Sequence, residues 1–127
     1  MIAYISGHLD LTVNEFYEHY REAIDKAMLA GDSFVIGDAI GVDWIAQTYL
    51  VATQLPIPAD RLIIYHMLER PRHAYSEYEW VGGFQSDEER DAAMTSISDY
   101  DIAWVRPGRE KSGTAKNLLR RNTKDFV

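Results

Sequence analysis

Three short segments rich in glycine and polar side chains follow apolar stretches of the chain, and they hold the residues best suited to bind a ligand. The first is Ser6-Gly7-His8, the second runs from Gly37 to Asp43, and the third covers residues 106–114. Glycine lets a ligand approach the backbone, hydroxyl groups donate hydrogen bonds, and histidine exchanges a proton near neutral pH. This chemistry is typical of a site for a phosphate and a sugar.

The third segment ends in Ser112-Gly113-Thr114, where a final helix is expected to begin. A helix N-terminus exposes unpaired N–H groups and a partial positive charge, so the segment predicts a phosphate site. The alternative is that Ser112 or Thr114 only caps the helix and Gly113 only turns the chain. Six cations follow one another here and could neutralise a small phosphorylated ligand: Arg106, Arg109, Lys111, Lys116, Arg120 and Arg121.

The second segment combines flexible glycines with two carboxylates. Gly37 and Gly41 permit tight turns, and Asp38 lies between them. Asp43 falls in the first turn of an expected helix, where it either hydrogen-bonds a sugar hydroxyl or complements the helix dipole. The segment is not a P-loop, because the Gly-Lys-Ser/Thr ending is missing.

Two further side chains have a functional and a structural interpretation. His8 is an acid, a base or a phosphate donor, or else an ordinary surface histidine. Arg90 lies in the first turn of an expected helix, where a cation is unfavourable. It therefore either faces a phosphate or pairs with Asp87 or Glu88.

Strands and helices alternate along the chain. Apolar runs predict strands at 2–5, 33–36, 61–66 and 101–105, and helical spacing predicts helices at 12–30, 42–54, 86–100 and 114–121. This order predicts one α/β domain over residues 1–127, a Rossmann-like three-layer sandwich with a mainly parallel sheet of four or five strands. In such a sheet ligands bind beyond the carboxyl ends of the strands, which is where the three polar segments lie.

Residues 68–85 show no clear period and predict a long loop, with an irregular edge strand or a disordered insert as alternatives. The aromatic residues Tyr78, Trp80 and Phe84 in this region either stack on the base of a ligand or take part in ordinary packing.

Composition excludes several classes of protein. A net charge of −7 over 127 residues argues against a partner made of long nucleic acid. The chain has no cysteine, and its four histidines lack ligand spacing, so we expect neither a metal nor a cofactor. No apolar run is long enough to cross a bilayer, and the first residues lack the basic start of a signal peptide. We therefore expect a cytoplasmic protein without a membrane partner.

Four segments together resemble the SLOG superfamily of small Rossmann-like proteins, which includes the DNA-processing and LONELY GUY types. They are residues 5–8, 37–46, 89–91 and 112–121. The resemblance implies a Rossmann-like fold, a homodimer or higher homo-oligomer, and a nucleotide or ADP-ribose-like ligand. It also implies that Gly113 and Thr114 hold phosphate, that Gly7 and Gly41 approach the ligand, and that Asp43 contacts the sugar or orders its loop.

Two residues depart from the family pattern. The glutamate with which the LONELY GUY type engages the ribose falls at Asn117, and an arginine frequent in close relatives falls at Leu9. An amide cannot accept a proton, so we expect a protein that senses, carries or sequesters a nucleotide-derived ligand. The alternative is an N-glycosidase or phosphoribohydrolase acting on a nucleoside monophosphate or related nucleotide, with Asp43 and Glu110 as its carboxylates. A third interpretation is a protein that kept the fold and lost the pocket.

Overall fold

A computed structural model describes residues 1–52 and 56–124 of the chain. One all-parallel sheet has the strand order β4-β3-β2-β1-β5 and consists of β1 (Ile2–Ser6), β2 (Ser33–Gly37), β3 (Leu62–Met67), β4 (Glu79–Phe84) and β5 (Tyr100–Ala103). The helices are α1 (Val13–His19), α2 (Arg21–Leu29), α3 (Val42–Val51), α4 (Asp87–Ile97) and α5 (Gly113–Lys124), with a short 3-10 helix, η1 (Ala59–Arg61). The predicted Rossmann-like sandwich is confirmed, with five strands.

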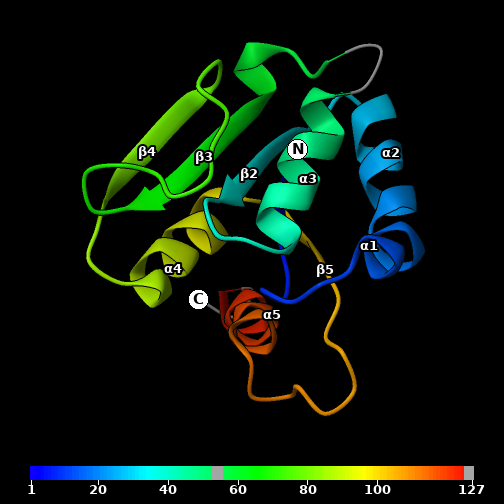
Figure 1. Ribbon diagram of the computed structural model, residues 1–127. Coiled ribbons are helices and arrows are strands. Elements are labelled where there is room, and N and C mark those ends of the chain that lie inside the picture. The colour runs from blue at the N-terminus through cyan, green and yellow to red at the C-terminus, as the bar shows by residue number, and fades with distance from the viewer. Residues whose placement is uncertain (53–55, 125–127) are drawn as a thin grey trace.

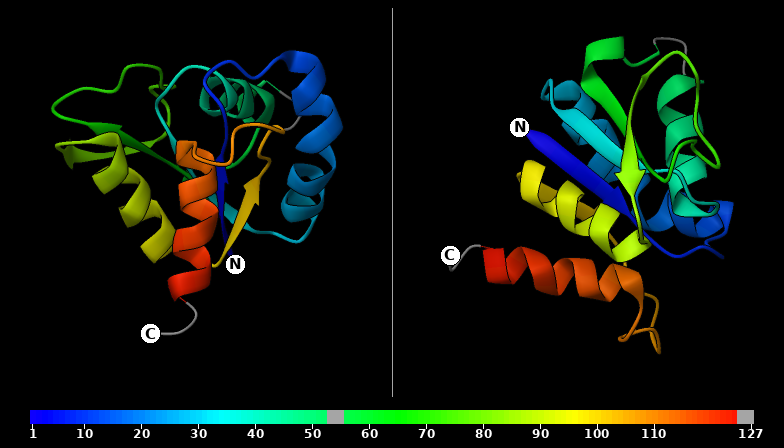
Figure 2. Two further views of the ribbon diagram at one scale, coloured as in Figure 1. Left: turned by 90° about the horizontal axis from the view of Figure 1, so that it is seen from below. Right: turned by 90° about the vertical axis from the view of Figure 1, so that its left-hand side faces the viewer.

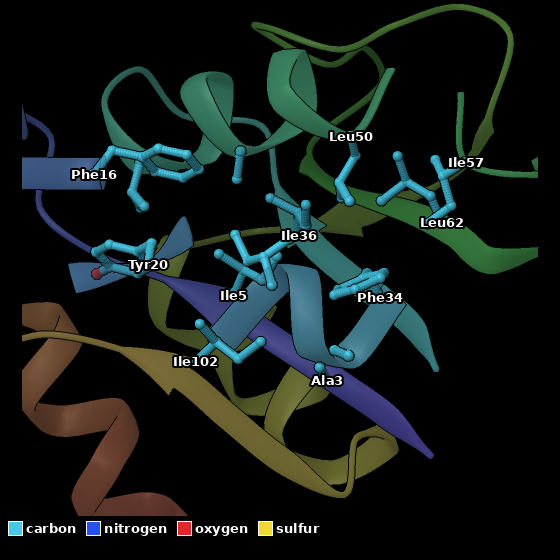
Figure 3. Packing of buried hydrophobic residues seen from close by; sticks show 14 of the residues in the cluster. Ala3, Ile5, Phe16, Tyr20, Phe34, Ile36, Leu50, Ile57, Leu62 and Ile102 are labelled. Carbon is cyan, nitrogen blue, oxygen red and sulfur yellow. The ribbon is translucent and has the colours of Figure 1, made fainter. Parts of the chain in front are cut away.

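Helices cover both faces of the sheet (Figures 1 and 2). Helices α1, α2 and α3 lie on one face, and α4 and α5 lie on the other. Side chains alternate along the central strands, so that Ile5 and Ile36 enter the core under α1–α3, whereas Tyr4 and Val35 pack toward Met94 of α4. The larger core is on the α1–α3 face (Figure 3), where Phe16, Phe34 and Leu62 are among its buried members. None of the described helices is long and apolar enough to cross a membrane.

The helix predicted at 12–30 is two helices that meet at Tyr20. Its start is as predicted, because Thr12 accepts from the Glu15 amide at 3.1 Å and Glu15 accepts from the Thr12 amide at 3.0 Å. Tyr20 then leaves helical geometry (φ −122°, ψ −39°) and is fully buried. Its hydroxyl donates to the Ser6 carbonyl at 2.7 Å and accepts from the Trp104 amide at 3.0 Å. The break therefore ties the end of β1 to the segment after β5.

Region 68–85 contains an edge strand, so the loop prediction is wrong over β4 and the alternative of an irregular edge strand is confirmed. Strand β4 pairs in parallel with β3, and their register shifts between Tyr65 and Met67. Gly82 lies against the His66 ring, where a Cβ would overlap the imidazole. Most side chains of β4 are exposed, so the strand lacks the apolar pattern by which buried strands are found. Helix α3 ends at Val51, and the predicted helix residues 53 and 54 lie outside the described part of the chain.

Candidate functional site

A pocket of about 520 Å³ opens at the carboxyl ends of β1 and β2, between the starts of α4 and α5. Strand β1 lies between β2 and β5. Strands β2, β3 and β4 are added one after another on one side of β1, and β5 is then added on its other side. This is the point of strand-order reversal at which open parallel sheets bind ligands. Eight of the predicted site residues line the pocket: Ser6, Gly7, His8, Asp43, Arg90, Ser112, Gly113 and Thr114.

The wall formed by the loop after β1 depends on two glycines. A Cβ on Gly7 would overlap the Tyr20 hydroxyl and lie 2.8 Å from Val42. Gly41 has a φ of +82°, and a Cβ there would overlap the His8 carbonyl. The two glycines therefore let the loop after β1 contact the start of α3. Gly7 lines the pocket. Gly41 packs behind this loop and is not among the lining residues, so the structure does not place it where it was predicted to approach a ligand.

Ser6 has an unsatisfied hydroxyl at this wall. The residue is 5% exposed, and its Oγ has no hydrogen-bond partner among the described residues. A buried polar group without a partner costs about 1–3 kcal/mol, and most such groups in native proteins are paired. Because Ser6 lines the pocket, a ligand oxygen is the natural partner for this hydroxyl.

The start of α5 forms another part of the pocket wall and exposes two amides. Ser112 caps the helix, since its Oγ accepts from the Ala115 amide at 3.2 Å. The amides of Gly113 and Thr114 have no acceptor among the described residues, and a Cβ on Gly113 would meet no atom within 4 Å. The predicted cap at Ser112 is confirmed, and it leaves the first two amides of the helix free for an anion.

His8 is buried and held as a neutral imidazole. Its Nε2 accepts from the Arg106 amide at 2.9 Å, so the ring proton is on Nδ1. Burial, together with the charges of Arg106 and Arg109, lowers the pKa of His8. The interpretation of His8 as a surface residue is therefore wrong, because the side chain is 4% exposed and lines the pocket.

Among the six cations named from the sequence, Arg109 lines this end of the pocket, whereas Arg106 does not. The Arg106 guanidinium turns away and binds Glu15 at 2.7 Å and Asp10 at 3.0 Å. Arg109 itself donates to Asp10 at 2.8 Å. Both arginines are thus already matched by carboxylates.

The other end of the pocket contains a network of arginines and aspartates. Arg90 donates to Asp38 at 2.7 Å and to Asp91 at 3.0 Å, and it also pairs with Asp87 at 3.3 Å. The predicted pairing of Arg90 with Asp87 is therefore confirmed. Arg72 adds a second cation, which binds Asp38 at 2.9 Å and Asp87 at 3.0 Å.

Asp38 is the fully buried centre of this network. It does not line the pocket, and it accepts from the Arg72 backbone amide at 2.7 Å as well as from both guanidinium groups. Burial raises the pKa of Asp38, but the hydrogen bonds and charges of Arg72 and Arg90 outweigh it and lower the pKa overall. Asp38 therefore holds the arginines in place and is not itself in reach of a ligand.

Asp43 is the carboxyl group of the pocket whose proton affinity is most suited to chemistry. Burial raises its pKa to about 7, against the opposing charge of Arg90, and its Oδ2 accepts from the Ala39 amide at 3.1 Å. A Cβ on Gly37 would lie 2.5 Å from this oxygen and 3.1 Å from Cζ of Arg90. Gly37, which does not itself line the pocket, therefore leaves room for the Asp43 and Arg90 side chains. A carboxyl with a pKa near neutrality in a pocket is a candidate acid or base.

Tyr4 and Asn117 connect the two ends of the pocket and were not predicted as ligand-binding residues. Asn117 Nδ2 donates to the Tyr4 hydroxyl at 3.0 Å, and Arg120 donates to Asn117 Oδ1 at 2.6 Å. Burial, and then the charge of Asp91 and a hydrogen bond to it, raise the pKa of Tyr4. Asn117 thus uses both ends of its amide within the fold. Tyr4 was missed because it lies within the apolar run of β1, which marks it as an ordinary core residue.

Glu110 and the aromatic residues of region 75–84 lie elsewhere. Glu110 is exposed outside the pocket, where its carboxylate accepts from the Gly108 amide at 3.0 Å. Tyr78 donates to the Ile57 carbonyl, Trp80 donates to the Tyr75 carbonyl, and Phe84 stacks on Tyr65. None of these aromatic side chains lines the pocket, so the packing alternative describes them.

No group of three histidine, cysteine, aspartate or glutamate side chains within residues 1–52 and 56–124 has the arrangement of a metal site. Comparisons with protein-family models, with curated proteins and with solved structures find no match for this chain. The resemblance to the SLOG superfamily therefore stays a prediction that rests on the residues quoted for it.

Proposed function

We propose that the pocket binds a nucleotide-derived small ligand and retains it without turnover, so that the protein acts as a sensor, a carrier or a sequestering protein. The observation that carries the proposal is the set of unpaired donors at one end of the pocket. The amides of Gly113 and Thr114 and the hydroxyl of Ser6 lack partners among the described residues. Three donors that face one pocket and lack acceptors favour an anionic ligand oxygen there.

A phosphate is the anion that suits this end best. The amides at the start of α5 add the positive end of the helix dipole, which favours negative charge by about 0.3–1 kcal/mol or more. Gly113 has no side chain to obstruct a ligand, and the space in the direction of a Cβ is empty. The backbone can therefore be reached directly by phosphate oxygens.

The opposite end of the pocket offers acceptors to a sugar. Asp43 and Asp91 line it, and each is held by a hydrogen bond, Asp91 from Arg90 and Asp43 from the Ala39 amide. Carboxylates accept hydrogen bonds from the hydroxyls of a ribose. A pocket of about 520 Å³ is within the range that encloses small ligands. A phosphate at α5 and a sugar toward Asp43 would place a nucleotide across the carboxyl end of β1.

Retention without turnover is favoured by Asn117. The position that holds a glutamate in the LONELY GUY type holds this amide, which cannot accept a proton. Its hydrogen bonds to Tyr4 and from Arg120 make it part of the scaffold. Asn117 therefore supplies no carboxylate at the position where the LONELY GUY type has its glutamate.

The experiment is mass spectrometry of the protein after incubation with nucleoside monophosphates, NAD, ADP-ribose and cyclic ADP-ribose forms, followed by removal of unbound ligand. We expect one intact ligand to be retained by the wild type and lost by Gly113→Val, because a β-branched side chain would fill the approach to the two amides. The matched control is Asn122→Val, which places the same side chain on an exposed turn of α5 outside the pocket. The proposal would be contradicted if the wild type retained none of these ligands, or if Gly113→Val retained as much ligand as Asn122→Val.

A second candidate function is hydrolysis of the N-glycosidic bond, and Asp43 is the observation that favours it. A pKa of about 7 lets this carboxyl donate or accept a proton at neutral pH. In the same incubations, release of free base that disappears with Asp43→Asn would replace the binding proposal with hydrolysis. Release that disappears with Glu110→Gln would instead support the role predicted for Glu110 from the sequence.

A further inference from the structure

The charged side chains of the pocket are already neutralised by one another. Arg90 binds Asp91 at 3.0 Å, Arg72 binds Asp87 at 3.0 Å, and Arg109 binds Asp10 at 2.8 Å. Fully buried Asp38 adds a further negative charge behind Arg72 and Arg90. The arginines therefore do not give the pocket a free positive charge.

The lining as a whole has no excess of cations. Its acidic side chains are Asp10, Asp43, Asp87 and Asp91, and its basic ones are Arg72, Arg90 and Arg109. None of the described residues that line the pocket is a lysine. A terminal phosphate or a polyphosphate carries two or more negative charges at neutral pH, and the sites that bind such groups supply Lys, Arg or a metal ion for them.

The donors at the start of α5 are neutral. They are the amides of Gly113 and Thr114 and, from the adjoining wall, the hydroxyl of Ser6. His8 adds no positive charge, because its Nε2 accepts from the Arg106 amide and the ring is neutral. Together with a helix dipole equivalent to about half a charge, these donors match one negative charge. A second charge on the same phosphate would find no free cation in the pocket lining, because Arg109 is already paired with Asp10.

We propose that the pocket selects a phosphate esterified on two sides, which carries one negative charge, over terminal phosphates that carry two. This inference rests on the proposed function, and it specifies the class of phosphate in the ligand. A phosphodiester keeps two unesterified oxygens for the Gly113 and Thr114 amides and brings no second charge that would need a free cation. Cyclic nucleotides and molecules in which phosphate joins two sugars belong to this class.

The test uses small probes that contain no base or sugar. Dimethyl phosphate carries one charge, and methyl phosphate carries two at pH 8, because the second pKa of a phosphomonoester is about 6. Each is titrated into 15N-labelled protein while the amide resonances of Gly113 and Thr114 are followed. We expect both resonances to shift with dimethyl phosphate, at a concentration roughly five- to tenfold lower than with methyl phosphate.

A second arm changes the charge of the pocket. Asp10→Asn frees Arg109 from its carboxylate partner, and the expected result is that methyl phosphate gains affinity until the preference falls to about twofold or less. The control Asp60→Asn removes the same charge from η1, which precedes the amino end of β3 and lies outside the pocket lining, and should leave the preference unchanged.

The outcomes separate the inference from the proposed function. Shifts that are larger with methyl phosphate than with dimethyl phosphate would overturn the selection for a diester and leave a phosphate site at α5. Resonances of Gly113 and Thr114 that move with neither probe would overturn the phosphate site itself, and the proposed function with it. An Asp10→Asn variant that prefers dimethyl phosphate as strongly as the wild type would show that paired charges do not set the selectivity.

Discussion

The two ends of the pocket differ in whether their polar groups are satisfied. At the end near α4, Arg90 and Asp38 are buried and form an ion pair between positions 52 residues apart in the sequence. At the end near α5, the hydroxyl of Ser6 and the amides of Gly113 and Thr114 have no partner among the described residues. A paired network holds a structure in place, whereas unpaired donors are costly unless a ligand satisfies them. The comparison favours a structural role for the paired network at the first end and supports the proposed anion site at the second.

The largest effect is expected for Asp38→Asn. The substitution leaves the buried guanidinium of Arg90 and the backbone amide of Arg72 facing a neutral group, and breaking a buried pair in this way costs about 3–5 kcal/mol. Urea denaturation should show a loss of this size in the free energy of unfolding. The matched control is Asp87→Asn, which removes an exposed partner of the same two arginines and should cost less than about 1 kcal/mol. Equal losses in the two variants would mean that Asp38 is not the centre of the network.

The next effect is a pH dependence that Asp43→Asn removes. Burial raises the pKa of Asp43 to about 7 in the folded protein, against about 4 in the unfolded chain. The neutral form is therefore favoured by folding, and its contribution to stability is present below pH 4 and is lost as the pH rises through 7.

The free energy of unfolding of the variant minus that of the wild type should rise between pH 4 and 7, by at most about 1.4 kcal/mol per pH unit. Denaturation curves over this range measure the slope. A difference that falls with pH would mean that Arg90 keeps Asp43 ionised and that its pKa lies below the ordinary value.

A smaller effect separates two buried serines. Ser6→Ala removes a hydroxyl without a partner, so the free energy of unfolding should stay unchanged or increase by up to about 1 kcal/mol. Ser98→Ala removes a hydroxyl that donates to the Met94 carbonyl at 2.6 Å and accepts from Arg121 at 2.6 Å, and it should destabilise the protein by about 1–2 kcal/mol. Thermal or urea unfolding compares them directly. A clear loss of stability in Ser6→Ala would show that its hydroxyl is satisfied within the fold.

The fold was predictable from the sequence because its central strands are buried on both faces and its helices carry their own starting signals. The apolar runs of β1, β2 and β3 and the capping box at Thr12 and Glu15 are local patterns. Strand β4 was missed because most of its side chains are exposed, so its sequence lacks the apolar run that marks a buried strand. The break at Tyr20 was missed because it depends on hydrogen bonds to Ser6 and Trp104, which are distant in the sequence.

The site was predictable where the residue type itself determines the role. Glycines, a serine cap and polar residues after strands correctly indicated Gly7, Ser112 and Gly113 as residues of one pocket. Ion pairs between distant segments are not visible in the sequence, so nothing distinguished Arg109, which lines the pocket, from Arg106, which binds Glu15. For the same reason the burial of Asp38 and the connection from Tyr4 to Asn117 appear only in three dimensions.

The most direct test of the account measures binding and stability together in Gly113→Val. The ligand retained by the wild type is titrated into both proteins by calorimetry, and the unfolding midpoints are recorded in its absence. Since a Cβ at Gly113 meets no atom within 4 Å, the midpoint should stay within a few degrees of the wild type, while affinity falls more than about tenfold. Unchanged affinity in a folded Gly113→Val variant would contradict the assignment of the α5 start as the anion site.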